Sequence, residues 1–215
     1  MTQHDYIQYD YIKDPKAIYA QSFATLREEV DFERFPANMH MVITRLIHSC
    51  GMVDIADDVA YSENFINSAQ MALQNGAPIL CDCEMVKSGI IKRLLPADNQ
   101  LICTLNDDAT PSIAAAQQTT RSAAAVKLWL PHINGAVVVI GNAPTSLFRL
   151  LEMLSETDTK PAAIIGFPVG FVGAVESKNA LIASELGIEY IALKGRRGGS
   201  AMASAVLNAV AGGLG

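Results

Sequence analysis

Of the four histidines in the chain, His48 has the position that best suits acid–base chemistry. A helical pattern that begins at Pro36 ends at Gly51, so His48 falls in its last turn. The carbonyl end of a helix favours a protonated imidazole, and a histidine there can donate a proton near neutral pH. Taken alone, this spacing favours a structural histidine at a helix end over a catalytic one.

Metal binding is the second chemistry that these residue types allow. The soft ligands give only H-x-C and C-x-C spacings, at His48, Cys50, Cys81 and Cys83, whereas zinc sites usually contain C-x₂₋₄-C pairs. We therefore predict no metal site. A Cys–His nucleophilic pair is no better supported, since no orienting partner is identifiable. The cysteines follow no disulfide pattern and residues 1–14 lack the apolar core of a signal peptide, so the expected location is cytoplasmic.

Three glycine-rich junctions offer places for an anionic ligand. They follow predicted strands, at residues 141–145, 166–173 and 195–200. Ligands of open parallel sheets bind outside the carboxyl ends of the strands, where helix N-termini present free N–H groups and glycines allow close approach. Together the junctions predict a broad anion-binding rim, although each one alone is more simply a tight turn.

Cationic side chains accompany these junctions. Arg196 and Arg197 lie inside the third one, Lys178 is expected in the first turn of the helix after Gly173, and Arg121 precedes an apolar helix. A lysine in a first helical turn opposes the helix dipole, which suggests that it meets an anion. A solvated lysine is the alternative.

Motifs that the chain lacks narrow the choice of anion. Neither G-x-G-x-x-G at the start of a helix nor G-x-x-x-x-G-K-[ST] is present, so a nucleotide-dependent oxidoreductase is disfavoured. The net charge of -6 argues against nucleic acid as a partner. No apolar run reaches the ~20 residues that a membrane span requires, so we expect no membrane association.

Five short apolar runs predict the strands that carry these junctions. Each is continuously apolar, as expected for strands that helices cover on both faces, and they span residues 78–81, 101–105, 136–140, 162–165 and 190–193. Helical segments alternate with them, which predicts an α/β fold with a mostly parallel, doubly wound sheet in three α/β/α layers. The chain has 215 residues and no linker, so we predict a single domain over residues 1–215.

The first 75 residues instead have helical spacing almost throughout. Asp14–Pro15 forms a helix start, with aspartate as the cap and proline in the first turn. A second helix runs from Pro36 to Gly51, and Ser62 would cap a third that stops at Asn75–Gly76. We expect this helical part to pack on the sheet.

The whole pattern resembles the precorrin-8X methylmutase family of cobalamin biosynthesis over nearly the full chain. Any one matching segment alone would be weak, but seven occur in the family's order at compatible separations. They are 17–24 (AIYAQSFA), 47–53 (IHSCGMV), 76–82 (GAPILCD), 120–124 (TRSAA), 141–145 (GNAPT), 169–178 (VGFVGAVESK) and 195–202 (GRRGGSAM).

The resemblance implies an isomerase that moves a methyl group from C11 to C12 on ring C of a corrin precursor, giving hydrogenobyrinic acid. It implies no cofactor and no external methyl donor, because the shift is intramolecular. The family's catalytic histidine corresponds to His48, which would protonate or hydrogen-bond the ring C region. Ser22 and Arg121 correspond to substrate contacts, and from loop position and charge we add Arg27, Asn142, Lys178 and Arg196.

The resemblance also implies a homodimer with the site near the subunit interface. A corrin precursor is broad, apolar across its ring and fringed with carboxylates, so an apolar cleft edged by arginines and helix N-termini would suit it. Two alternatives stay open at this point. One is a cobalt-precorrin-8 methylmutase that acts on a cobalt-containing ring, and the other is a corrinoid carrier that binds the product without catalysis.

Overall fold

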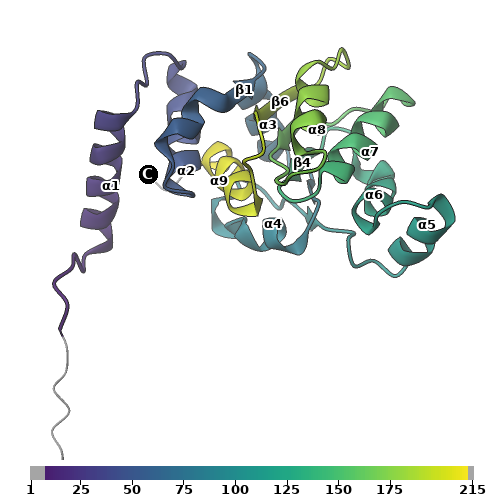
Figure 1. The fold of residues 1–215 in the computed structure, drawn as a ribbon, viewed down its shortest axis with the longest axis horizontal. Coiled ribbons are helices and arrows are strands. Elements are labelled where there is room, and N and C mark those ends of the chain that lie inside the picture. The colour runs from purple at the N-terminus through teal and green to yellow at the C-terminus, as the bar shows by residue number, and fades with distance from the viewer. Residues whose placement is uncertain (1–7, 213–215) are drawn as a thin grey trace, which may run out of the picture.

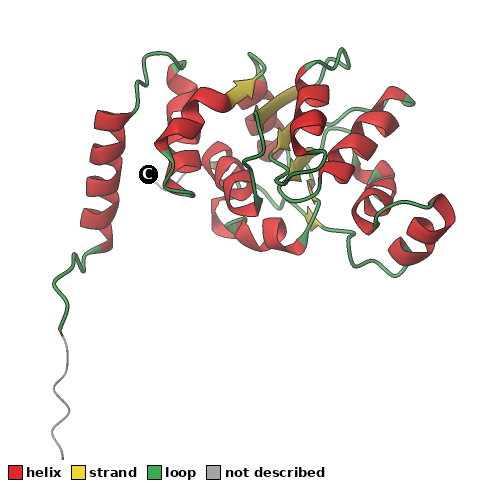
Figure 2. Cartoon of the chain, in the orientation of Figure 1, coloured by secondary structure: helices red, strands yellow, loops and turns green. Residues whose placement is uncertain are grey.

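The computed structural model describes residues 8–212 as three layers, with helices on both faces of one six-stranded sheet (Figures 1 and 2). The α/β prediction is confirmed. The strands are β1 (Val59–Tyr61), β2 (Ile79–Cys81), β3 (Leu101–Ile102), β4 (Val137–Ile140), β5 (Ala163–Gly166) and β6 (Glu189–Leu193).

The strand order is β1-β6-β5-β4-β2-β3, and every pairing is parallel except that of β1 with β6. Each of the five predicted apolar runs overlaps a strand, although the run at 101–105 forms only the two residues of β3. The antiparallel edge strand β1 was not predicted, because its three residues lie in a region of helical spacing. The order reverses between β2 and β4, so their carboxyl ends form the position where ligands of such sheets usually bind.

Alternate residues of each strand face two separate apolar cores. Ile79 and Cys81 of β2 belong to one core and Leu80 to the other. Helices α2 (His40–His48), α3 (Phe65–Gln74), α4 (Glu84–Gly89) and α9 (Ser200–Ala211) cover the first face. Helices α6 (Arg121–Lys127), α7 (Pro144–Ser155) and α8 (Ala174–Ile182) cover the second, and α5 (Thr110–Gln117) packs on α6.

Helix α1 (Pro15–Glu29) stands away from this body (Figure 1). Its start was predicted correctly: the Asp14 carboxylate accepts the N–H groups of Lys16 and Ala17, and Pro15 is the first helical residue. Residues 8–21 are all exposed, and within α1 only Leu26 is buried. The helical part thus packs on the sheet through α2 and α3, while α1 contacts α2.

Two local predictions are corrected. Ser62 does not cap α3, which begins after Asn64; its hydroxyl bonds to the Glu189 carboxylate and accepts the Tyr190 N–H at 2.8 Å, which ties the β1 edge to β6. Lys178 lies in the second turn of α8 rather than the first, because the helix begins at Ala174. Over residues 8–212, no helix is both long and apolar enough to cross a membrane.

Candidate functional site

His48 and Ser22 form the centre of the candidate site. The ring of His48 is exposed at the end of α2, and its Nδ1 lies 2.9 Å from the Ser22 hydroxyl oxygen on α1. Both residues line a groove of ≈ 400 Å³, together with Thr25, Glu29 and Val53. Because Ser22 occupies Nδ1, the other ring nitrogen, Nε2, is the one available to a ligand.

Aromatic rings hold the imidazole from the α1 side. The centroids of Tyr19 and Phe23 each lie 5.9 Å from that of His48, and Phe23 meets it edge to face. The buried guanidinium of Arg45 lies over the same two rings, at 5.7 and 5.8 Å from their centroids. The orientation of His48 therefore depends on α1, a helix that is otherwise exposed.

A second hollow, of ≈ 280 Å³, lies at the glycine-rich loops. It is lined by Met52, Phe171, Arg196 and Met202 among others. Phe171 is 85% exposed, and the Arg196 guanidinium lies 5.5 Å from the centre of its ring. Since Met52 lines this hollow and its neighbour Val53 lines the His48 groove, the two hollows lie on either side of one short segment.

The loop at 141–143 binds a carboxylate of the protein itself. The Asp82 oxygens accept the N–H groups of Gly141, Asn142 and Ala143 at 3.0, 2.9 and 2.9 Å. Burial raises the pKa of this carboxyl group, whereas the three N–H groups act in the opposite direction. Asp82 follows β2 directly, so it fills the crevice where the strand order reverses. One of the three junctions therefore binds Asp82 rather than leaving its N–H groups to a ligand, so the anion-binding rim is narrower than predicted. The sequence analysis did not predict this role of Asp82.

The remaining predicted contacts are spread around this edge. Arg121 is exposed at the start of α6, and its guanidinium donates to the Leu105 carbonyl at 3.1 Å and to Asn106 at 2.9 Å. The Asn142 side chain is exposed. Arg27 lines a different hollow, of ≈ 250 Å³, with Phe23, Phe32 and His40. The structure thus brings Ser22 to His48 and places Arg196 in the adjoining hollow, while Arg27 and Arg121 lie apart from both.

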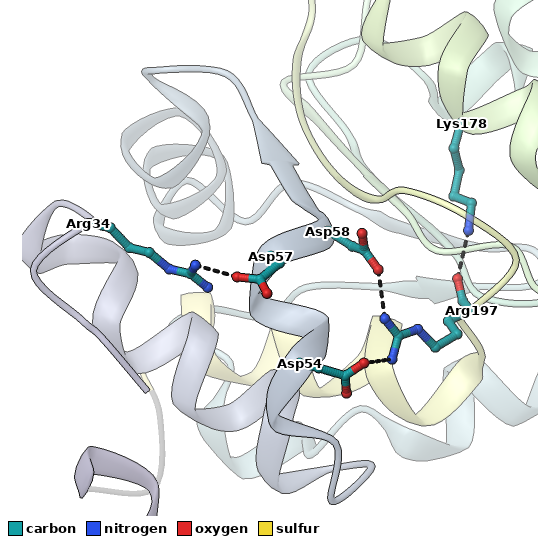
Figure 3. Close-up of polar contacts among 6 residues, drawn as sticks. All are labelled: Arg34, Asp54, Asp57, Asp58, Lys178 and Arg197. Atoms are coloured by element: carbon teal, nitrogen blue, oxygen red, sulfur yellow. Dashed lines mark hydrogen bonds and ion pairs between the residues drawn. The ribbon is translucent and has the colours of Figure 1, made fainter. Parts of the chain in front are cut away.

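Lys178 and Arg197 take part in a network of polar contacts that runs from the interior to the surface (Figure 3). The Lys178 side chain is fully buried, and its ammonium donates to the backbone carbonyl of Arg197 at 2.6 Å. The Arg197 guanidinium pairs with Asp54 at 2.6 Å and with Asp58 at 2.7 Å. These acids lie on the 3₁₀ segment Val53–Asp58 (η2), and the sequence analysis assigned them no role.

The part of the chain that the structure describes contains neither a cluster of metal ligands nor a disulfide. Across residues 8–212, no group of three or more His, Cys, Asp and Glu side chains could hold a metal ion. All four cysteines are free thiols. Burial raises the pKa of Cys81 above its usual range and that of Cys103 to about 11, so both are held as neutral thiols at pH 7.

The fold and the site together define a doubly wound α/β protein with an exposed histidine near apolar, arginine-edged loops, and comparison with known proteins gives its family. The profile of the precorrin-8X methylmutase family matches residues 17–212. The precorrin-8X methylmutase of Pseudomonas aeruginosa is 52% identical over 202 residues, which cover 94% of this chain and 97% of the relative. The cobalt-precorrin-8 methylmutase of Salmonella typhimurium is 37% identical, over 93% of this chain and 96% of the relative.

A solved structure agrees with these sequence matches. The precorrin-8X methylmutase of Thermus thermophilus superposes with a TM-score of 0.82 at 32% identity, covering 91% of this chain and 94% of the other. The chain therefore belongs to the precorrin-8X methylmutase family, isomerases of cobalamin biosynthesis.

Proposed function

We propose that the chain moves the ring C methyl group of precorrin-8X from C11 to C12, giving hydrogenobyrinic acid, with His48 as the proton donor. The observation that carries this proposal is the exposed His48 ring, whose Nδ1 lies 2.9 Å from the Ser22 hydroxyl inside a groove of ≈ 400 Å³. In the protonated ring, Nδ1–H donates to the Ser22 oxygen and Nε2–H remains for the substrate.

The proposed step is an intramolecular rearrangement. The bond from the methyl carbon to C11 breaks as the bond to C12 forms, so the substrate and product have the same atoms. A proton or hydrogen bond from Nε2 at the ring C region withdraws electron density from the conjugated macrocycle and lowers the barrier to migration. The proton returns to His48 afterwards. The step therefore needs neither a redox cofactor nor a methyl donor.

Charged and apolar groups near the His48 groove and further along this edge of the protein suit a macrocycle fringed with carboxylates. Arg196 is exposed beside Phe171 and Val172, which are 85% and 90% exposed, so a cation and an apolar surface lie together. We assign the carboxylates to Arg196, Arg121, Asn142 and Arg27, and the ring to the apolar surface between them.

Of the two possible substrates, we favour the metal-free ring. The relative from Pseudomonas aeruginosa, which is named for precorrin-8X, is 52% identical to this chain, whereas that from Salmonella typhimurium, named for the cobalt-containing precursor, is 37% identical. The two identities can be compared directly because both relatives are covered almost completely. The higher identity to the relative named for precorrin-8X favours the metal-free substrate.

We further propose that the enzyme is a cytoplasmic homodimer in which α1 contacts the second copy. Ile12, Ile18 and Tyr19 are 43%, 45% and 39% exposed, an unusual set of apolar side chains to leave open to water along one projecting segment. Tyr19 also packs against His48, so a second copy on α1 would bring the interface close to the site. Light scattering tests this state, and Ile18→Glu is expected to give a monomer.

The proposed function is tested by incubating the protein with precorrin-8X and, separately, with cobalt-precorrin-8 while the visible spectrum is followed. Conversion of the metal-free substrate is expected. His48→Ala should lower the rate by ~10²–10⁴-fold while retaining product binding, because it removes only the proton donor. The matched control is His132→Ala, an exposed histidine on the 3₁₀ segment Leu130–His132. Full activity of His48→Ala would remove the catalytic assignment, and product binding without any conversion by the wild type would favour a carrier.

A further inference from the structure

The loop at residues 195–199, between β6 and α9, is held from several directions. The Gly199 N–H donates to the Phe167 carbonyl at 2.9 Å, and the Gly170 N–H donates to the Arg196 carbonyl at 3.2 Å. A Cβ atom at Gly198 would lie 2.4 Å from the Phe167 oxygen, so only glycine permits this approach. The loop that carries Arg196 is therefore in contact with the loop that carries Phe171.

Arg197 is held at both its side chain and its backbone. Its guanidinium bridges Asp54 and Asp58 on η2, and its carbonyl accepts the Lys178 ammonium from α8 (Figure 3). The neighbouring Arg196 is exposed instead and lines the hollow beside Phe171. The contacts of Arg197 therefore restrain the backbone that carries Arg196.

The charge of Lys178 is energetically unfavourable at this buried position, which indicates a specific role for the side chain. A buried ammonium is strongly unfavourable unless it is paired, and the Asp58 carboxylate, whose charge acts on Lys178, forms its ion pair with Arg197 instead. An unbranched apolar side chain of the same length, such as methionine, would fill the same space at no electrostatic cost. Among residues 8–212, the one hydrogen bond that lysine makes and methionine cannot is the bond to the Arg197 carbonyl.

The network also connects the two sides of the candidate site. The segment η2 begins five positions after His48 in the chain, and Val53 at its start lines the His48 groove. The ion pairs from Arg197 to Asp54 and Asp58 therefore join the His48 side to the Arg196 side.

We propose that Lys178 is a positioning residue which, with the Asp54–Arg197–Asp58 ion pairs, fixes Arg196 and the start of α9 relative to His48. This inference rests on the proposed function for its effect on turnover, but not for its effect on the loop. In this proposal Lys178 does not contact a substrate carboxylate itself. It acts on the substrate through Arg196.

The first experiment measures the loop without any substrate. Amide hydrogen exchange is compared between the wild type and Lys178→Met, with attention to the N–H groups of Gly170 and Gly199. Loss of the bond to Arg197 should accelerate their exchange by roughly tenfold or more. The matched control is Lys160→Met, because Lys160 is an exposed lysine whose ammonium also donates to a backbone carbonyl, that of Leu186. Unchanged exchange in Lys178→Met would overturn the proposal.

A second variant keeps the test decisive if Lys178→Met fails to fold. Asp58→Asn weakens the hold on the Arg197 guanidinium, and its neighbour Asp57→Asn is the control, since Asp57 pairs with Arg34 on the opposite side of η2 (Figure 3). Faster exchange at Gly199 is expected in Asp58→Asn and not in Asp57→Asn. Equal exchange in the two variants would count against the network.

Turnover then separates an indirect role from direct contact. With precorrin-8X, Lys178→Met should raise KM by roughly tenfold with a smaller change in kcat, because Arg196 is displaced from its carboxylate. In an Arg196→Ala background the same change should have little further effect, since Lys178 acts through Arg196. Additive effects would contradict this and favour direct contact. If the wild type does not convert precorrin-8X, the proposed function fails while the exchange experiment still decides the positioning role.

Discussion

Ser22 on α1 and His48 on α2 are hydrogen-bonded at 2.9 Å, although they lie 26 positions apart in the chain. The bond joins a projecting helix, in which only Leu26 is buried, to the end of a helix packed in the core. The hydroxyl engages Nδ1 and leaves Nε2 as the ring nitrogen available to a ligand. An otherwise exposed helix is thereby made part of the site.

Loss of the Ser22 hydroxyl should impair catalysis more than binding. Ser22→Ala removes the partner of Nδ1 and lets the ring rotate, so kcat for precorrin-8X should fall by about tenfold with a small change in KM. Thr25→Ala is the control, because Thr25 lines the same groove and its hydroxyl bonds only to the Gln21 carbonyl of its own helix. A variant Ser22→Ala with wild-type kcat would show that the aromatic rings alone orient His48.

Arg121→Ala should weaken binding of the corrin product. The exposed guanidinium is available to a carboxylate, and a lost charge-assisted hydrogen bond costs about 1.5–3 kcal/mol, or roughly 10- to 150-fold in Kd. Titration of hydrogenobyrinic acid, followed by its visible spectrum, measures this loss. Arg93→Ala, at an exposed arginine on the 3₁₀ segment Lys92–Leu94, should bind as the wild type does. Unchanged affinity of Arg121→Ala would remove it from the substrate contacts.

Asp82→Ala should destabilise the fold. It leaves the N–H groups of Gly141, Asn142 and Ala143 without their acceptor in a place largely closed to water, at a cost of about 3 kcal/mol. Urea unfolding can be followed by the fluorescence of the buried Trp129. Asp107→Ala is the control: Asp107 accepts the Ala109 N–H at 2.9 Å in an exposed turn, and its loss should cost less than about 1 kcal/mol. Similar costs for both variants would refute the structural role of Asp82.

The elements of the sheet were predictable because their signals are local. A run such as Val137–Ile140 is buried at every position, and continuous apolar character reports this directly. β1 was missed because its three half-buried residues become a strand only by pairing with β6, more than 125 positions later. The same long-range pairing explains the error at Ser62, whose hydroxyl has a partner in β6 rather than in the nearest helix.

The residues of the candidate site likewise divide into those with a local signal in the sequence and those whose partners lie far along the chain. The position of His48 at a helix end follows from local spacing, but that spacing alone favoured a structural role. The resemblance to a family indicated Ser22 only as a substrate contact, and its hydrogen bond to His48 was not predicted. Asp82 could have been suspected from its place directly after a predicted strand. The pairs of Arg197 with Asp54 and Asp58 span 143 and 139 positions, and no local pattern reports them. Charge alone could not separate Arg196, which is exposed, from its neighbour, which is not.

The pH dependence of stability tests the burial of Lys178. Burial lowers the pKa of Lys178 from its ordinary value of 10.5 to about 8, while the nearby Asp58 carboxylate acts in the opposite direction. Between pH 8 and 10.5 the unfolded chain holds this proton and the folded chain has released it, so Lys178 makes the free energy of unfolding rise with pH in that window. Below pH 8 both states are protonated and the cost of the buried charge is present in full.

Lys178→Met should therefore lose this rise. The charged groups near the ammonium, Asp58 on η2 and the Arg197 guanidinium with its partner Asp54, remain in the variant, as do the thiols that titrate above pH 8. Their contributions cancel when the two proteins are compared at each pH. Urea unfolding at pH 7 to 10.5 measures the free energy of unfolding of both proteins. The difference between the variant and the wild type should favour the variant least at the highest pH. A constant difference across this range would mean that Lys178 keeps its ordinary pKa and that its ammonium is not held away from water.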